Sequence, residues 1–121
     1  MSKCILALTA MAMLMAAPAH AAEGDSAQFV AMCRASQGDP KQKADTLKLF
    51  EGMQCLRYIE GFKEGLAAAG GAPRFCIPAK SPLGDQVVAY VKWADAHPDM
   101  LTQPKEATVL KALGEIYPCG K

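Results

Sequence analysis

Four cysteines are the residues of this sequence with the most evident chemistry. They are Cys33, Cys55, Cys76 and Cys119, and a fifth, Cys4, lies near the N-terminus. No two of them are spaced as Cys-x-x-Cys, which argues against a thioredoxin-type redox motif, half of a common zinc site and covalent haem attachment. An even set of four cysteines in a small exported domain is typical of two disulfides.

His97 is the second candidate for chemistry, because it lies between two carboxylates. Asp95 and Asp99 flank it two residues away on either side, and Met100 follows. Acid–base or metal chemistry is one interpretation, but carboxylates beside a proline that stops a helix are more typical of a solvated helix end. His97 and Met100 together supply too few ligands for a copper site. We therefore predict no metal and no cofactor.

The remaining sequence offers no catalytic motif. A Gly-x-Ser-x-Gly elbow and a phosphate-binding loop are both missing, and the carboxylates are spread along the chain without a marked pair. His97 is the only histidine after residue 21, and disulfide formation would occupy all four later cysteines. The sequence therefore predicts a protein that is not an enzyme.

Length and charge restrict the class of protein further. The chain has 121 residues, with 13 lysines and arginines against 12 aspartates and glutamates, a formal net charge of +1. That length fits a single domain. The near balance of charge leaves no basic stripe to neutralise phosphates, which argues against nucleic acid as a partner.

The N-terminal segment is typical of a secretory signal peptide. Lys3 gives a charged start, residues 4–17 form an apolar run, and Ala19-His20-Ala21 fits the small-x-small cleavage site. The run is shorter than the roughly 20 residues that a membrane span needs, so we expect cleavage after this site and no membrane span. A buried N-terminal helix is the alternative interpretation.

Removal of residues 1–21 as a signal peptide would leave residues 22–121 as a single domain. That domain keeps an even number of cysteines, because Cys4 is lost with the leader. Disulfides persist outside the reducing cytosol, and the signal suits export to a periplasm. We therefore predict a periplasmic protein.

Glycine and proline divide the mature chain into helical segments without an internal repeat. Apolar residues recur every three or four positions, and no segment alternates with the period of two that a strand requires. The predicted helices are residues 26–35, residues 44–69, a third from Ser81-Pro82 to about residue 96, and a fourth from Gln103-Pro104 to Pro118. We predict an all-α fold, a small four-helix bundle in orthogonal or antiparallel packing, with room for a short extra helix.

The longest predicted helix, residues 44–69, has one apolar face and two glycines in its interior. The apolar stripe is Gly52, Cys55, Ile59, Phe62 and Leu66. Gly61 and Gly65 each cost about 1 kcal/mol relative to alanine inside a helix. We expect them to mark where another helix comes close, the alternative being a helix that frays early.

The order of helices and cysteines suggests how the cysteines pair, among three possible connectivities. Cys76 precedes the third helix and Cys119 follows the fourth, so an antiparallel hairpin of these helices would bring the two together. Cys33, near the end of the first helix, would face Cys55 on the second. We therefore favour Cys33–Cys55 and Cys76–Cys119, each worth about 3–4 kcal/mol in the chain-entropy model.

The segments around these cysteines resemble a known family. In order they are residues 55–61 (Cys-Leu-Arg-Tyr-Ile-Glu-Gly), residues 75–78 (Phe-Cys-Ile-Pro), residues 91–94 (Val-Lys-Trp-Ala), His97-Pro98, Ala112-Leu113 and Tyr117-Pro118-Cys119. This ordered set, from about Phe29 to Cys119, resembles the Rap/Tai immunity proteins, which neutralise amidase effectors of type VI secretion. Arg57 departs from the glycine often found at that place in the family.

The resemblance implies an all-helical, disulfide-bonded periplasmic protein, frequently a homodimer. Such a protein binds and occludes a cognate peptidoglycan amidase, whose cysteine nucleophile and histidine base lie in a cleft, and it needs no catalysis of its own. In this family the tip and loop around the third helix supply contacts. Carried over to this sequence, that region comprises Trp93, Asp95, His97, Asp99, Met100 and Gln103.

Trp93 has two interpretations that the sequence leaves open. It lies about 100° from the centre of the apolar face of its helix, taking 100° per residue. A tryptophan off the main face is suited to anchor a partner. It is equally suited to pack against the fourth helix or a second copy of the chain.

A second function class fits the same features. A small, disulfide-bonded helical protein of the periplasm can serve as a chaperone or envelope-stress factor with no dedicated toxin partner. The two classes differ in what they bind. An immunity protein forms a stoichiometric complex with one amidase, whereas a chaperone shows little selectivity.

Overall fold

The computed structural model describes residues 24–38 and 45–120, and this part of the chain is helical with no strand. Its elements, in order, are α1 (Ser26–Ala35), α2 (Thr46–Ala69), α3 (Leu83–Ala96), the 3-10 helix η1 (Pro98–Thr102) and α4 (Lys105–Ile116). The predicted all-α fold is confirmed, and η1 is the short extra helix. The predicted signal peptide lies outside the described residues. None of the described helices is long and apolar enough to cross a membrane.

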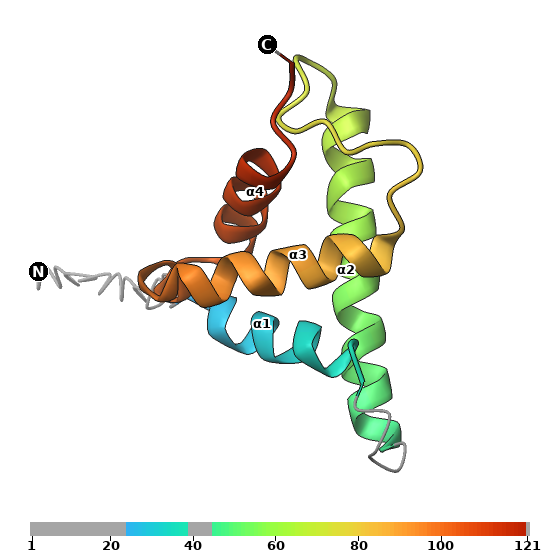
Figure 1. Ribbon diagram of the computed structural model, residues 1–121, viewed down its shortest axis with the longest axis vertical. Helices are drawn as coiled ribbons and strands as arrows, with labels where there is room; N and C mark the ends of the chain where they lie inside the picture. Colours follow the sequence, from blue (N-terminus) through green and yellow to red (C-terminus); the bar gives the residue numbers. More distant parts are fainter. Residues whose placement is uncertain (1–23, 39–44, 121) are drawn as a thin grey trace, which may run out of the picture.

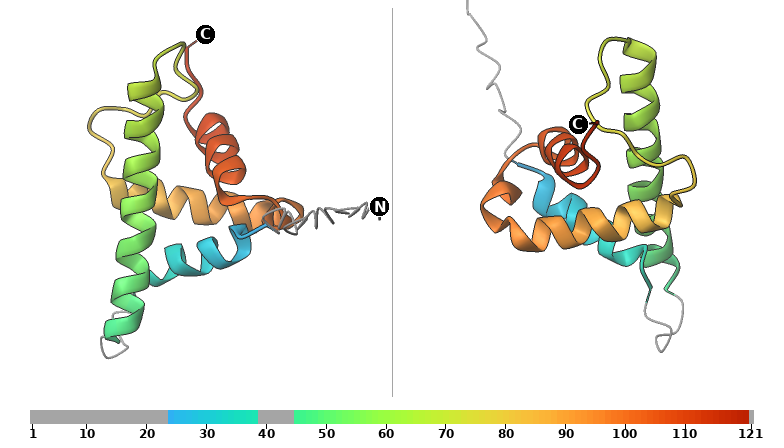
Figure 2. Two further views of the ribbon diagram at one scale, coloured as in Figure 1. Left: turned by 180° about the vertical axis from the view of Figure 1, so that it is seen from behind. Right: turned by 45° about the horizontal axis from the view of Figure 1, so that its top comes forward.

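The helices pack at crossed angles around one core. Helices α1 and α3 lie side by side and run in opposite directions, while the longer α2 crosses them near the end of α1 and the start of α3 (Figure 1). Helix α4 rises from the far end of α3 and crosses it steeply, which the two views of Figure 2 also show. The segment between α2 and α3 returns along the top of the molecule to the start of α3 (Figure 1).

Local sequence explains where the helices begin and end. The Asp45 carboxylate accepts a hydrogen bond from the Leu47 amide, at 3.0 Å, and so caps α2. Pro82 and Pro104 precede α3 and α4 as N-caps, where a missing amide hydrogen costs nothing. Helix α2 ends at Gly70, whose φ of 76° suits a residue without a Cβ. The predicted start of this helix at residue 44 lies outside the described residues.

The core lies where α1, α2, α3 and α4 meet. Its fully buried members come from every helix, and the largest are Tyr90, Ile59, Leu113, Val87 and Val109. Gly52 lets α2 approach the end of α1, because a Cβ placed there would lie 2.6 Å from the Cα of Ser36. That distance leaves no room for any side chain, so the glycine is required at this crossing.

Gly61 and Gly65 do not lie against another helix of the described chain, contrary to our expectation. Both are exposed on α2, and within the described chain nothing lies within 4 Å of a Cβ built at either position. The expectation that another helix packs against them is wrong for the described helices of this chain. The helix nevertheless continues past both to Ala69, so early fraying does not occur either.

Both predicted disulfides are confirmed. Cys33 pairs with Cys55 and joins α1 to α2. Cys76 pairs with Cys119, although α4 crosses α3 and does not form the antiparallel hairpin that we expected. The cysteines meet because the loop before α3 runs alongside the end of α4. There the Cys76 amide donates to the Tyr117 carbonyl, at 2.8 Å.

Candidate functional site

The end of α3 is built around a stacked pair of rings. Helix α3 stops at His97, which is followed by a proline, and the His97 imidazole lies on the Trp93 indole with centroids 4.2 Å apart and planes inclined by 17°. The Nδ1 atom of His97 lies 2.8 Å from the Trp93 carbonyl oxygen, so it is placed to donate a hydrogen bond there. The two side chains therefore fix each other at the junction of α3 and η1.

Trp93 packs against α4. Its side chain is only 7% exposed, and its indole N–H donates to a Glu115 carboxylate oxygen at 2.6 Å. Glu115 also pairs with Lys111, at 2.9 Å. The Lys111 ammonium, followed by the indole N–H, holds the pKa of Glu115 below its usual range. Of the two interpretations left open for Trp93, the structure favours packing against the fourth helix.

Asp95 points to a different neighbour. Both of its carboxylate oxygens accept from the two terminal nitrogens of Arg34, which ties α3 to α1 in a fork-to-fork ion pair. The Arg34 guanidinium lowers the pKa of Asp95, and the carboxylate in turn raises the pKa of Arg34. Asp95 is thus held on the α1 side of α3, away from the Trp93 contact with α4.

The remaining predicted contact residues lie on or next to η1. Asp99 is exposed in the first turn of η1, and Met100 is partly buried against the core. Gln103 is exposed, but its carbonyl oxygen accepts from the Ser26 hydroxyl at 2.5 Å and from the Ser26 amide at 3.4 Å. The structure therefore brings Trp93 and His97 together, and it distributes the other four over separate contacts around this end of α3.

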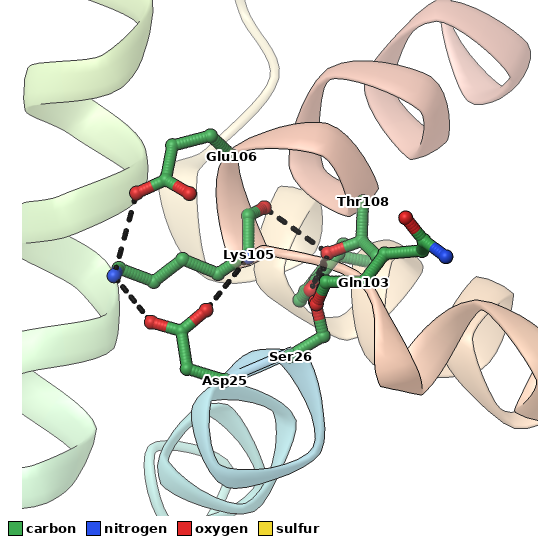
Figure 3. A network of polar contacts seen from close by, with 7 residues as sticks. Asp25, Ser26, Gln103, Lys105, Glu106 and Thr108 are labelled. Carbon is green, nitrogen blue, oxygen red and sulfur yellow. Dashed lines mark hydrogen bonds and ion pairs between the residues drawn. The ribbon is translucent and has the colours of Figure 1, made fainter. Parts of the chain in front are cut away.

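A polar network that the sequence did not predict fixes η1 and α4 to the start of α1 (Figure 3). One oxygen of the Asp25 carboxylate accepts from the Lys105 backbone amide at 2.8 Å, and the other pairs with the Lys105 ammonium at 2.5 Å. Asp25 precedes α1 but makes no cap to it. Its carboxylate instead caps the first turn of α4, 80 residues further along the chain.

A chain of hydroxyl groups continues this network into the core. The Ser26 hydroxyl donates its one proton to the Gln103 carbonyl oxygen. The Thr108 hydroxyl lies 2.9 Å from the Ser26 hydroxyl oxygen and 3.0 Å from the Lys105 carbonyl oxygen, and its single proton is directed to these two acceptors. Thr108 accepts in turn from the Tyr90 phenol, at 3.0 Å. All three side chains are buried, and the chain joins α1, α3, α4 and the end of η1. Burial raises the pKa of Tyr90, in keeping with a neutral phenol that donates.

A shallow hollow of about 310 Å³ opens beside the network, lined by residues of α1 and α2 and by Lys105. The Lys105 ammonium lies 5.3 Å from the centroid of the Tyr58 ring, a cation–π contact, and 3.4 Å from Glu106. Burial, followed by the negative charge of Glu106, raises the pKa of Tyr58 to about 12. The Tyr58 phenol therefore stays neutral at physiological pH.

Replacement of Asp25 by asparagine tests the charged part of this network. Asparagine keeps the oxygen that caps α4 but loses the ion pair with Lys105, so we expect a loss of about 0.2–1 kcal/mol, as for partly exposed pairs. The Lys105 hydrogen bond lowers the pKa of Asp25 below 3.8 in the folded protein. The advantage of the wild type is thus present above about pH 5 and is lost as the pH falls through the folded-state pKa.

Urea titrations of both proteins between pH 2 and pH 7 measure this difference. The two stability curves should converge at the acid end of that range. Asp45→Asn is the matched control, because Asp45 also caps a helix but has no ion-pair partner within the described residues. A gap between Asp25→Asn and wild type that does not change with pH would contradict the assignment of the effect to the Asp25 charge.

The contacts at the end of α3 hold its exposed surface in a fixed shape. Among residues 24–38 and 45–120, no three His, Cys, Asp or Glu side chains are grouped to hold a metal ion. Ion pairs join Arg34 of α1 to Asp95 of α3 and Asp25 to Lys105 of α4, Lys111 pairs with Glu115 within α4, and two disulfides cross-link the helices and loops. This arrangement defines a small, cross-linked helical protein that presents a fixed surface.

Comparison with known proteins places the chain in a family. The family model described as Rap1a immunity proteins matches residues 25–119, which spans all the described helices. The chain belongs to this family of immunity proteins. Comparisons with curated proteins and with solved structures give no match.

Proposed function

We propose that the protein is a periplasmic immunity protein that binds a peptidoglycan amidase effector of type VI secretion and occludes its active-site cleft. The observation that carries this proposal is the family match over residues 25–119. The sequence of residues 1–21, which is typical of a signal peptide, and the two disulfides support function in an oxidising compartment. The amidase itself follows from the resemblance of the cysteine-flanking motifs to Rap/Tai proteins.

Inhibition by occlusion requires a surface that keeps its shape, not reactive groups. The exposed end of α3 together with η1 meets this requirement, because contacts with the rest of the protein hold both elements in place. The Trp93–His97 stack holds the end of α3, and the Ser26 contacts hold the Gln103 carbonyl after η1. In this proposal Asp99, the exposed edge of His97 and the exposed part of Met100 contact the amidase. Trp93, Asp95 and Gln103 mainly position them.

The first experiment is reconstitution with a peptidoglycan amidase effector, sought among the genes that neighbour this one. The two purified proteins should form a stoichiometric complex at neutral pH, and the complex should no longer release peptide stems from peptidoglycan. No complex and undiminished hydrolysis would overturn the proposal. Weak, unselective binding to many unfolded proteins would instead identify a chaperone.

Charge reversal at Asp99 tests the contact surface within the complex. Asp99 is exposed at the start of η1, so Asp99→Lys should leave the fold intact and weaken amidase binding by about tenfold or more. Asp85→Lys is the matched control, because Asp85 is equally an exposed acidic residue in the first turn of a helix, at the opposite end of α3. Titration calorimetry and inhibition assays measure both variants. Equal binding by the two variants would place the contact surface elsewhere.

A further inference from the structure

A hollow of about 570 Å³ lies between the C-terminal end of α2 and the loop that follows this helix. Figure 1 shows this end of α2 at the top, where the loop turns back beside the C-terminal end of the chain. The walls of the hollow include the small residues Ala67, Ala69 and Ala72 and the partly buried Leu66 and Phe75. A hollow of this size with mostly apolar walls suits a small ligand.

Two cations and no carboxylate are among the residues that line this hollow. Lys63 is partly buried, and its ammonium donates to the side-chain oxygen of Gln86, a neutral acceptor, at 2.7 Å. Neither Lys63 nor the exposed Arg74 forms an ion pair with another described residue. In the hollow beside Tyr58, by contrast, Lys105 is already paired with carboxylates. The two cations at the end of α2 therefore favour a ligand with negative charge.

The loop side of the hollow offers main-chain groups in place of side chains. Gly70 and Gly71 have φ angles of 76° and 91°, so the chain turns there without a Cβ that would keep a ligand away from the backbone. Within the described residues, the amides of residues 71, 72, 74 and 75 donate to no backbone group, and the carbonyls of residues 68–69 accept from none. Successive free amides of this kind capture the terminal carboxylate of a peptide.

Contacts with the end of α4 hold the loop in place. The disulfide between Cys76 and Cys119 joins the two segments, and the Cys76 amide donates to the Tyr117 carbonyl at 2.8 Å. A Cβ built at Gly114 would lie 3.5 Å from the Arg74 carbonyl oxygen, so α4 passes directly beside the loop. The hollow is therefore formed before a ligand arrives, which lowers the entropic cost of binding.

We propose that this hollow binds a short peptide that has small side chains and ends in a free carboxylate. Arg74 and the free amides of the loop hold the carboxylate, and Lys63 adds positive charge. The small side chains of the peptide occupy the apolar walls. A fatty acid also has a carboxylate, but its acyl chain leaves the carbonyls of residues 68–69 without a donor, whereas the amides of a peptide can donate to them.

In the periplasm, the peptide stems of peptidoglycan have this chemistry, because they are short, end in alanine and have a free carboxylate. This choice of source rests on the proposed function, whereas the binding of the peptide does not. Helix η1 lies at the end of α3 that is far from α2 (Figure 1), so the hollow and the proposed amidase surface are separate. Failure to bind an amidase leaves the peptide site standing, and failure to bind the peptide leaves the proposed inhibition untouched.

Titration of the isotope-labelled, mature, disulfide-bonded protein by nuclear magnetic resonance is the experiment. The probe is a peptide of three alanines, acetylated at its N-terminus, with a free carboxylate and D-alanine at its last two positions. It should shift the amide signals of residues 63–76 and leave those of η1 unchanged. The same peptide with a C-terminal amide should bind at least about tenfold more weakly, because it lacks the charge that the site recognises.

Two variants with matched controls locate the site. Arg74→Gln should weaken binding of the probe at least about tenfold, whereas Lys48→Gln removes an exposed positive charge at the other end of α2 and should have no effect. Ala69→Glu places a carboxylate in the hollow and should weaken binding at least as much. Ala68→Glu introduces the same charge at the neighbouring exposed position, which does not line the hollow, and should change the affinity less than about threefold. Thermal unfolding checks that all four variants fold.

Four results would overturn the inference. They are the absence of shifts at residues 63–76 at millimolar probe, equal binding of the peptide and its C-terminal amide, tighter binding of laurate than of the peptide, and equal losses for Ala68→Glu and Ala69→Glu. A probe made entirely of L-alanine that binds much more tightly than the D-alanine form would assign the hollow to the C-termini of proteins, and it would overturn the cell wall as the source.

Discussion

The protein without its buried disulfide is expected to unfold at least about 12 °C below the wild type. The variant is Cys33→Ala with Cys55→Ala, which leaves no unpaired thiol. The bridge closes 22 residues of chain, which in the chain-entropy model is worth about 3 kcal/mol. A change of 1 kcal/mol moves the melting temperature of a domain this size by about 4–8 °C. Both sulfurs are also fully buried, so the loss of packing adds to the effect.

Calorimetry of the two paired-cysteine variants separates these contributions. The bridge between Cys76 and Cys119 spans 43 residues, so chain entropy alone predicts the larger loss for its removal, about 4 kcal/mol. Of its two cysteines, however, Cys76 is exposed and Cys119 is only partly buried. If the burial of Cys33 and Cys55 adds to the effect of their disulfide, the two variants should lose similar stability although the two disulfides close loops of different length. A melting temperature within about 2 °C of wild type for either variant would contradict the structural role of that bridge.

Removal of the buried hydroxyl of Thr108 is expected to cost about 1–3 kcal/mol. Valine has nearly the same shape, so Thr108→Val changes the hydrogen bonds and little else. The change leaves the proton of the Tyr90 phenol without its acceptor, and a buried unpaired donor costs about 1–3 kcal/mol, whereas the Ser26 hydroxyl still donates to the Gln103 carbonyl. Chemical denaturation of the variant measures the loss.

Tyr90→Phe is the control for this interpretation. Tyr90→Phe removes the phenol donor together with its hydrogen bond to Thr108. Only one acceptor position of Thr108 is then unfilled, so the expected loss of stability is about 0.5–1.5 kcal/mol. The double variant should lose less than the sum of the single variants, because Thr108→Val no longer leaves a phenol unpaired. A larger loss for Tyr90→Phe than for Thr108→Val would show that the direction of the hydrogen bonds is reversed.

The helices and the disulfides could be predicted from the sequence because they depend on local signals. Apolar spacing and the prolines at positions 82 and 104 mark the helices within a few residues. The order of the cysteines along predicted helices was enough to favour the pairing of Cys33 with Cys55 and of Cys76 with Cys119, even though the expected hairpin of the last two helices is absent. The course of the loop before α3, which runs alongside the end of α4, brings the second pair together.

The contacts between distant helices could not be predicted. Asp25 precedes a helix and has the residue type of a local cap, yet its carboxylate caps a helix 80 residues away. Nothing near Asp25 in the sequence indicates Lys105 as its partner. In the same way, the off-face position of Trp93 indicated a second contact surface, but only the packing of α3 on α4 shows that Glu115 receives its indole N–H. Tertiary geometry decides such partners.

The two disulfides close consecutive, non-overlapping loops of the chain, from residue 33 to 55 and from residue 76 to 119. If the chain is exported N-terminus first, as the proposed periplasmic function requires, each pair of bonded cysteines emerges before the next cysteine appears. Oxidation in order of emergence gives the native pairing directly. Maturation should accordingly need a thiol oxidase alone, with no isomerase to reshuffle wrong bonds.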